Sequence, residues 1–192
     1  MFKCIPYRNY EVKAIEEWVN EYAERGYRVA QIYEQYVKFV KNTGPRVYYR
    51  VRYIPDNKEI NGAFWYEDLY FYHSTNPGEL PPADYEGDSL AAAAVEGKPT
   101  VWHAIMLVVA IVLMISEIWV GYVPAPYRLM CYLGALDIFR IYCMQIYWMY
   151  HAFRIYKNDG KSEHAPIRQN YTFSLVCDAI VLVVIAATYI FV

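Results

Sequence analysis

The stretch Arg46–Tyr53, with the sequence RVYYRVRY, alternates regularly between two kinds of side chain. One set is apolar or aromatic: Val47, Tyr49, Val51 and Tyr53. The other set is mostly basic: Arg46, Tyr48, Arg50 and Arg52. Because successive side chains of a β-strand point to opposite faces, this stretch predicts a strand with one buried face and one basic face.

Shorter stretches with the same period of two lie on both sides of this strand. Tyr27–Ile32 and Gln35–Lys41 precede it, and Gly62–Tyr66 and Leu69–His73 follow it as a predicted closing hairpin. Phe2–Tyr7 is a candidate for a short first strand. Pro, Gly, Asn and Asp residues separate several of these stretches, as they do in turns. We therefore predict a run of antiparallel strands.

The segment after Asn9 has the period of a helix instead. Its apolar residues form one stripe: Ala14, Ile15, Trp18, Val19, Tyr22 and Ala23. Its acidic residues are predicted on the other side: Glu11, Glu16, Glu17, Glu21 and Glu24. Asn9 is a candidate N-cap, and Gly26 stands where a glycine commonly ends a helix. One helix on an antiparallel sheet makes residues 1–73 a small α+β domain.

Two parts of this domain resemble each other faintly. A glycine followed by an aromatic or small residue and then a strand occurs in segment 26–39 and again in segment 62–72. The similarity suggests a degenerate internal duplication.

The helix end and the strand together resemble a known family. The residues that carry the resemblance are Glu16, Trp18, Asn20, Glu21, Ala23, Gly26, Tyr27, Arg28 and Val47–Tyr53. Over residues 1–73 the chain is similar to the domain of unknown function 2812, and it departs from that family at residues 58–62, where the family usually has a longer helix. The resemblance implies a bacterial protein with downstream membrane helices, in some genomes encoded beside a PadR-type regulator. It implies no catalytic residues.

Residues 74–100 differ in composition from the domain before them. They are rich in Pro and Gly and in acidic residues, with room for one helical turn at Leu90–Val95. This composition predicts a flexible acidic linker.

Three long apolar stretches follow, at residues 101–122, 127–150 and 171–192. A helix of about 20 apolar residues covers the ~30 Å core of a bilayer. The sequence therefore predicts three transmembrane α-helices after the α+β domain. The loop between the last two carries Arg154, Lys157, Lys161 and Arg168. Because such loops face the cytoplasm, we predict a multi-pass cell-membrane protein with a cytoplasmic N-terminus and an extracytoplasmic C-terminus.

Four charged residues lie within the predicted transmembrane helices: Glu117, Asp137, Arg140 and Asp178. A lone charge is costly in apolar surroundings, and Arg140 and Asp178 have similar predicted depths. We predict that Arg140 pairs with Asp178 and that Asp137 is the second partner. The pair either docks two helices or forms part of a proton or ion path; Glu117 lies near the outer edge.

The sequence gives little support for metal binding, cofactor binding, catalysis or nucleic-acid binding. The four cysteines form no CxxC pair, and the four histidines are scattered, so we expect no metal site and no cofactor. Motifs of nucleotide-binding loops, hydrolases and kinases are absent from the sequence, so we assign no catalytic residues. The formal net charge of −2 argues against nucleic acid as a partner.

These patterns lead to two hypotheses about function. The first is a membrane-anchored, non-enzymatic regulatory or interaction module whose cytoplasmic domain binds a protein partner or a ligand. Arg46, Arg50 and Arg52 would then contact an acidic partner or anionic lipid headgroups, unless neighbouring glutamates simply balance their charge. The second is a small oligomeric transport or channel component that uses the charged residues of its helices. Membrane lipids and a protein partner or second copy are the expected partners.

Overall fold

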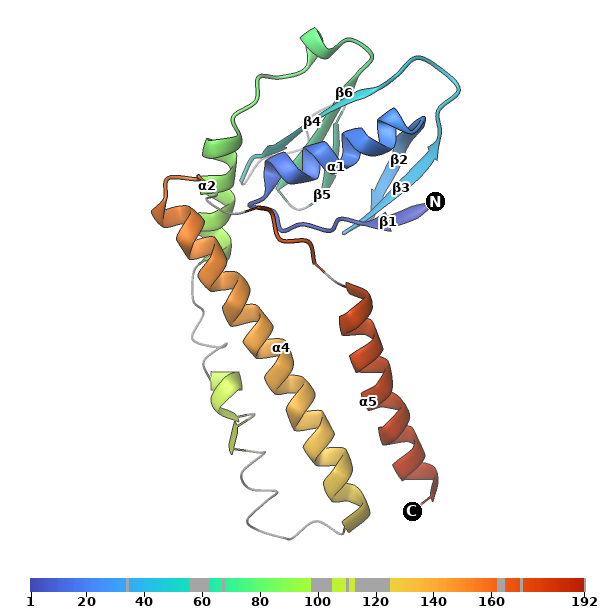
Figure 1. Cartoon of the computed structure of the whole chain (residues 1–192), viewed down its shortest axis with the longest axis vertical. Coiled ribbons are helices and arrows are strands. Elements are labelled where there is room, and N and C mark those ends of the chain that lie inside the picture. The colour runs from blue at the N-terminus through green and yellow to red at the C-terminus, as the bar shows by residue number, and fades with distance from the viewer. Residues whose placement is uncertain are drawn as a thin grey trace. The chain divides into compact units, whose positions relative to one another are not determined.

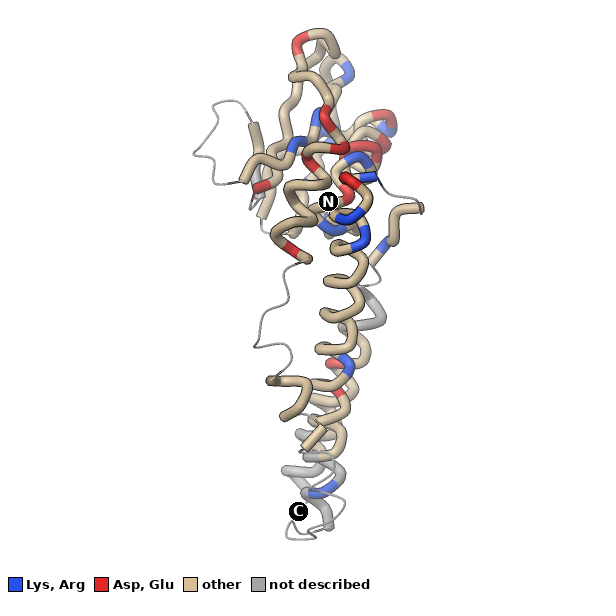
Figure 2. The backbone as a smooth tube through the Cα atoms, turned by 90° about the vertical axis from the view of Figure 1, so that its left-hand side faces the viewer, with Lys and Arg blue, Asp and Glu red and all other residues tan. Residues whose placement is uncertain are grey.

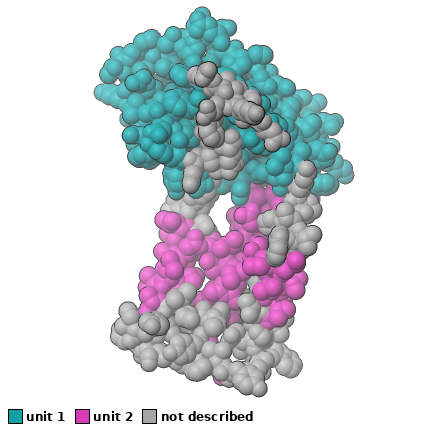
Figure 3. Space-filling view, turned by 180° about the vertical axis from the view of Figure 1, so that it is seen from behind, with its two compact units in different colours: residues 1–97, 152–169 teal, residues 98–151, 170–192 magenta. Residues whose placement is uncertain are grey.

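The computed structural model describes residues 1–33, 35–55, 63–66, 68–97, 105–109, 111–112, 125–161, 165–169 and 171–191. These residues fall into two units (Figure 3). Unit 1 combines Met1–Gly97 with Ala152–Gln169, and unit 2 combines Lys98–His151 with Asn170–Val192. The α+β unit is thus larger than the predicted domain of residues 1–73, because a segment from late in the chain returns to it.

Unit 1 contains two three-stranded antiparallel sheets where the sequence predicted one sheet (Figure 1). The first has the order β1-β3-β2, with β1 at Phe2–Cys4, β2 at Tyr27–Tyr33 and β3 at Tyr36–Lys41. The second has the order β4-β6-β5, with β4 at Tyr48–Tyr53, β5 at Ala63–Tyr66 and β6 at Leu69–Ser74. Both sheets place their third strand in the middle, which is the arrangement that an internal duplication predicts.

The register of β4 confirms the predicted alternation. Its central residues Arg50 and Val51 pair with Tyr72 and Phe71 of β6. Tyr49, Val51 and Tyr53 are buried, whereas the side chains between them are only partly covered. The predicted closing hairpin is also present as β5 and β6.

Helix α1, at Val12–Glu24, packs its apolar stripe against β2 and β4 of the two sheets (Figure 1). Large, fully buried side chains of this core come from α1, β3, β4 and β6: Ile15, Val19, Val37, Phe39, Val51, Leu69 and Phe71. Burial of each such side chain contributes about 1.5–3 kcal/mol. The helix ends as predicted, because Gly26 adopts a φ of +80° that favours glycine.

The predicted linker contains ordered structure that packs on this core. A short 3₁₀ helix, η1, spans Pro77–Glu79, and helix α2 spans Tyr85–Glu96. The Asp84 side chain caps α2 by accepting the Gly87 N–H at 3.1 Å. Ala92 and Ala93 are fully buried, and α2 contacts both α1 and β4. The small side chains of these alanines allow α2 to pack closely. The composition of residues 74–100 had led to the prediction of a linker instead.

Two long helices follow: α4 at Ala125–Lys157 and α5 at Tyr171–Phe191. Among the residues that the structure describes, no helix is both long enough and apolar enough to cross a membrane. This finding contradicts the predicted transmembrane helices and the multi-pass membrane location derived from them. In α4 the polar side chains of Asp137, Arg140 and Gln145 interrupt the apolar sequence. Most of the first predicted span, residues 101–122, lies outside the described residues.

Charged residues are unevenly distributed in the described part of the chain. They gather in the strands and helices of unit 1 and are sparse along α4 and α5 (Figure 2). Candidate sites for polar ligands are therefore concentrated in unit 1.

Candidate functional site

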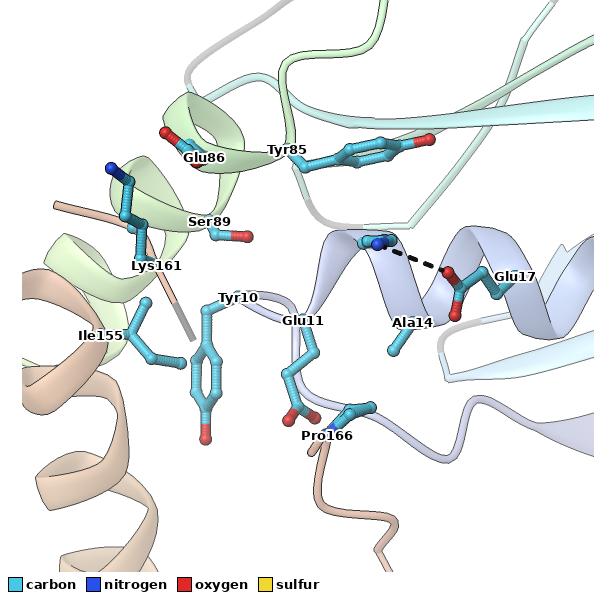
Figure 4. Close-up of a pocket in the computed structure, with 12 residues that line it drawn as sticks. Tyr10, Glu11, Ala14, Glu17, Tyr85, Glu86, Ser89, Ile155, Lys161 and Pro166 are labelled. Carbon is cyan, nitrogen blue, oxygen red and sulfur yellow. Dashed lines mark ion pairs between the residues drawn. The ribbon is translucent and has the colours of Figure 1, made fainter. Parts of the chain in front are cut away.

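A cavity of about 380 Å³ lies within unit 1. Its lining comes from the start of α1, the start of α2, the end of α4 and the segment after α4 (Figure 4). The lining residues are Tyr10, Glu11, Lys13, Ala14, Glu17, Tyr85, Glu86, Ser89, Ile155, Gly160, Lys161 and Pro166. Segments far apart in the sequence therefore meet around one space.

Glu11 is the buried carboxylate of this cavity. It occupies the N-cap position of α1, but its side chain makes no capping bond with the helix. Instead, its Oε1 accepts the backbone N–H of Ile167 at 2.9 Å. Only 7% of the residue is exposed, and its buried Oε2 has no hydrogen-bond partner among the described residues. Glu11 is thus a buried lining residue whose carboxylate has one oxygen bonded to the backbone and the other closed to solvent.

The surroundings of Glu11 favour the protonated form of its carboxyl group. Burial raises the pKa of Glu11 from its ordinary 4.5 to about 7, because an ionised carboxylate is poorly solvated there. The Ile167 and Arg8 amides and the Arg8 charge lower this pKa, whereas the charge of Glu96 raises it further. Near neutral pH the group can therefore exchange a proton readily, or respond to a charge placed beside it.

The walls of the cavity are about equally apolar and polar. Tyr10 and Ile155 are buried to 1% and 5% exposure, and Tyr10 lies beside Glu11 (Figure 4). Ser89 of α2 is also buried and points toward the start of α1 (Figure 4). The lining is therefore more polar than the mostly apolar walls that are typical of small-molecule sites, and it suits a ligand with polar groups.

Tyr85 is held in place by a polar network behind the cavity. Its hydroxyl donates to Glu16 Oε1 at 2.7 Å and accepts from Arg50 Nη1 at 3.0 Å. Glu16 Oε2 in turn accepts the Val51 N–H of β4 at 2.9 Å. Burial and the neighbouring Glu16 raise the pKa of Tyr85 to about 12, so its hydroxyl remains a donor at neutral pH. This wall of the cavity is preorganised.

Gly160 closes another side of the cavity. It has a φ of +81°, and its amide donates to the Ile155 carbonyl at 3.0 Å, which ends α4 in a tight turn. A Cβ atom at this position would lie 2.1 Å from the carbonyl oxygen of Glu86. Only glycine therefore allows the end of α4 to approach α2 this closely.

The structure gives two of the three predicted partner-binding arginines internal roles. Arg52 Nε donates to Asp88 Oδ2 of α2 at 2.5 Å, and Nη2 donates to Oδ1 at 3.2 Å. Arg50 pairs with Glu16 at 3.6 Å besides contacting the Tyr85 hydroxyl. Arg46 remains on the surface, in an exposed pair with Glu24 at 2.8 Å. The basic face of β4 is thus largely covered by α1 and α2.

The predicted charged cluster of the long helices is partly present. In unit 2, Arg140 of α4 forms ion pairs with Asp178 of α5 and, at 2.7 Å, with Asp137 one turn away. The predicted pairing of Arg140 with both aspartates is therefore confirmed. Glu117 lies outside the described residues. The pair connects α4 to α5, which is the structural role that the sequence left as one alternative.

Sequence reasoning missed the cavity and misplaced two acidic residues at the start of α1. Glu11 and Glu16 were predicted on the solvated side of α1, but both are 7% exposed. The one hint in the sequence is the uneven spacing of the acidic residues at the start of α1. That spacing carries no direct information about which distant segments, such as α2 or residues 165–169, pack there.

Comparisons with known proteins assign neither a family nor a function to this site. Among the described residues, no cluster of His, Cys, Asp and Glu could hold a metal ion. The resemblance to the domain of unknown function 2812 stays a prediction. No family model, curated protein or solved structure matches the chain.

Proposed function

We propose that this chain is a non-enzymatic binding module whose unit 1 takes up a small-molecule ligand in the Glu11 cavity. The observation that carries the proposal is a cavity whose lining joins α1, α2 and the end of α4, with one wall held in place by the hydrogen bonds of Tyr85. Its volume of about 380 Å³ falls in the range of small-molecule sites, roughly 300–1,000 Å³.

The position of the cavity suggests how binding could regulate the protein. The ligand would touch the N-terminal part of unit 1 and the returning segment Ala152–Gln169 at the same time. Direct contacts between these parts include the Glu11–Ile167 hydrogen bond and a bond from the Gln169 N–H to the Pro6 carbonyl at 2.7 Å. A bound ligand would add contacts across this junction and stabilise the docked segment.

The cavity lining is better suited to binding than to catalysis. The lining residues that the structure describes include neither histidine nor cysteine, and the Tyr85 hydroxyl is engaged by Glu16 and Arg50. Among these residues no hydrogen bond joins the Ser89 hydroxyl to a base, as the nucleophile–base pair of covalent catalysis would require. The alternative of a transport component depended on transmembrane helices and is not retained.

A cavity-filling variant tests this proposal. Ser89→Phe places a ring in the cavity, and Thr75→Phe adds the same ring at an exposed position as a matched control. We expect small fragments to shift the NMR signals of lining residues in the parent and in Thr75→Phe, but not in Ser89→Phe. Circular dichroism and thermal unfolding would verify that both variants fold. Equal fragment binding by both variants, or no binding by the parent, would contradict the proposal.

A further inference from the structure

The first sheet of unit 1, β1-β3-β2, has one face packed in the core and one face open to solvent. Val37 and Phe39 of β3 are buried, and the Phe39 ring meets Tyr22 and Trp18 of α1 at centroid distances of 4.4 and 5.6 Å. Helix α1 therefore covers the face to which they belong. Because side chains alternate along a strand, their neighbours belong to the opposite face, called the outer face below. The strand register places on it Phe2, Arg28, Gln31, Tyr33, Tyr36 and Lys38.

The aromatic side chains of the outer face are unusually exposed. Phe2, Tyr33 and Tyr36 have exposed fractions of 58%, 45% and 46%. The rings of Phe2 and Tyr33 have centroids 6.1 Å apart although β3 lies between their strands, and Tyr36 is the register partner of Tyr33. The three rings therefore form one group. Large apolar groups gathered on an open surface usually mark a binding surface.

The charged residues of the outer face are cations. Strands β1, β2 and β3 contain no Asp or Glu, whereas Arg28 and Lys38 both belong to this face. The Lys38 Nζ lies 5.8 Å from the centre of the Phe2 ring. Neither cation forms an ion pair with any residue that the structure describes; Glu34, between β2 and β3 in the sequence, lies outside those residues.

The net charge of the whole chain does not describe this face. The acidic residues of α1 lie on the other side of the sheet, because α1 packs against the face that contains Phe39. The formal charge of −2 therefore averages an acidic helix with a basic, aromatic sheet surface. A partner of the outer face should have flat apolar groups and negative charges close together.

We propose that the outer face binds single-stranded nucleic acid, with bases stacked on Phe2, Tyr33 and Tyr36 and phosphates beside Arg28 and Lys38. An exposed ring can stack on any base, because every base has a π-face, and cations beside it contact the backbone. A sheet with exposed aromatic residues can stack two or three bases of a single strand in this way. None of these residues lines the cavity of unit 1, so the inference is independent of the proposed function.

Two other partners fit the outer face less well. A nucleic-acid duplex hides the faces of its bases, so only its phosphates could use this surface. An extended proline-rich peptide would pack on the rings, but it has no phosphates for Arg28 and Lys38. A single strand uses the rings and the cations at the same time.

Fluorescence anisotropy of the full chain with a labelled oligothymidine of about ten nucleotides tests the proposal. We expect binding at about 50 mM salt and at least about tenfold weaker binding of a duplex of the same length. Tyr36→Ala should weaken the binding of the single strand about 5- to 100-fold, whereas Tyr36→Phe keeps the ring and should bind like the parent. Tyr156→Ala removes a similarly exposed tyrosine from α4 and is the matched control.

Lys38→Gln tests the phosphate contact separately. Each phosphate contact contributes about 0.7 to the slope of log affinity against log salt concentration for a single strand. The slope should therefore become shallower by about 0.7 in Lys38→Gln. It should stay unchanged in Lys157→Gln, which removes an exposed lysine from the end of α4.

Several results would overturn the inference. If the parent does not bind the single strand at low salt, or binds the duplex equally well, the outer face is not a single-strand site. Equal binding by Tyr36→Ala and the parent would show that the rings do not stack on bases. A proline-rich peptide that binds the parent, loses affinity in Tyr36→Ala and displaces no oligonucleotide would identify a peptide site instead. Circular dichroism would verify folding, and Tyr33→Ala provides a second ring deletion for the same comparison.

Discussion

The side chain of Asn20 on α1 forms two hydrogen bonds with the backbone of Tyr49 on β4. Asn20 Nδ2 donates to the Tyr49 carbonyl at 2.9 Å, and the Tyr49 N–H donates to Asn20 Oδ1 at 3.0 Å. The amide thereby pairs with the free edge of β4 as a neighbouring strand would. The Tyr49 hydroxyl accepts the Val29 N–H of β2 at 2.8 Å, which connects this edge to the other sheet.

Asn20→Ala should lower the free energy of unfolding by about 2–3 kcal/mol, because it leaves a partly buried N–H and C=O of β4 without partners. Chemical denaturation followed by tryptophan fluorescence would measure the change. Glu21→Ala, on the exposed side of the same helix, serves as the control and should cost less than about 0.5 kcal/mol. Equal effects of the two substitutions would show that the Asn20 bonds contribute nothing specific.

Arg52→Gln and Arg46→Gln should differ strongly although both residues belong to the same predicted basic face. Arg52→Gln leaves the carboxylate of Asp88, which is 4% exposed, without its cation and should cost about 2–4 kcal/mol. Arg46→Gln breaks an exposed pair and should cost less than about 1 kcal/mol. Urea unfolding curves of the two variants would measure this difference. Similar small losses would mean that Arg52 does not hold α2 in place.

Gly160→Ala should destabilise unit 1 by more than about 2 kcal/mol, because the new Cβ would clash with the Glu86 carbonyl and the residue has a positive φ. Gly134→Ala is the matched control: no atom of the described residues lies within 4 Å of a Cβ in this helical position. Alanine there should stabilise α4 by about 0.5–1 kcal/mol. Thermal unfolding should show a lower midpoint than the parent for Gly160→Ala and a higher midpoint for Gly134→Ala.

Stability should fall as the pH rises from about 4.5 to about 7 because of Glu11. Its pKa of about 7 in the folded protein exceeds the ordinary 4.5, so the folded state binds more protons than the unfolded state over this interval. The loss should amount to about 3 kcal/mol, and it should be complete above the folded pKa. Denaturation at several pH values would measure it.

The Glu11→Gln variant should show a flatter pH profile and should be more stable than the parent at pH 8. Glutamine carries no charge to be buried and can still accept the Ile167 N–H. Glu17→Gln should keep the slope of the parent. An unchanged slope in Glu11→Gln would show that another group causes the pH dependence.

Exchanging the charges of Arg140 and Asp178 should preserve much of the contact between α4 and α5. Arg140→Leu alone leaves Asp137 and Asp178 without their cation and should cost about 1–2 kcal/mol. The double variant Arg140→Asp/Asp178→Arg can still form an ion pair across the two helices. Thermal unfolding should therefore rank it between the parent and Arg140→Leu. A double variant as unstable as Arg140→Leu would contradict a specific pairing.

The secondary structure of unit 1 was largely predictable because its signals are local. The alternation in Val47–Tyr53, the helical stripe around Trp18 and the glycine at position 26 each reflect the geometry of a few neighbouring residues. The division into two sheets and the docking of α2 were not predictable in this way. They depend on which segments meet in space, and the alanines of α2 are compatible with both a linker and a buried helix.

The sequence by itself determined most of the strands and the first helix, since periodicity identifies them directly. It also predicted the pairing of Arg140 with Asp178, but from similar depths in transmembrane helices that the structure does not support. Only the tertiary structure decided that Arg50, Arg52 and Glu16 serve the interior and that Glu11 lies in a cavity. The physical reason is distance along the chain: the Ile167 amide reaches Glu11 across 156 positions of sequence. The local sequence predicts that Glu11 is solvated. Because the distant segment that contains Ile167 buries it, the solvation of Glu11 changes, and with it the pKa and the hydrogen-bond partners of its carboxyl group.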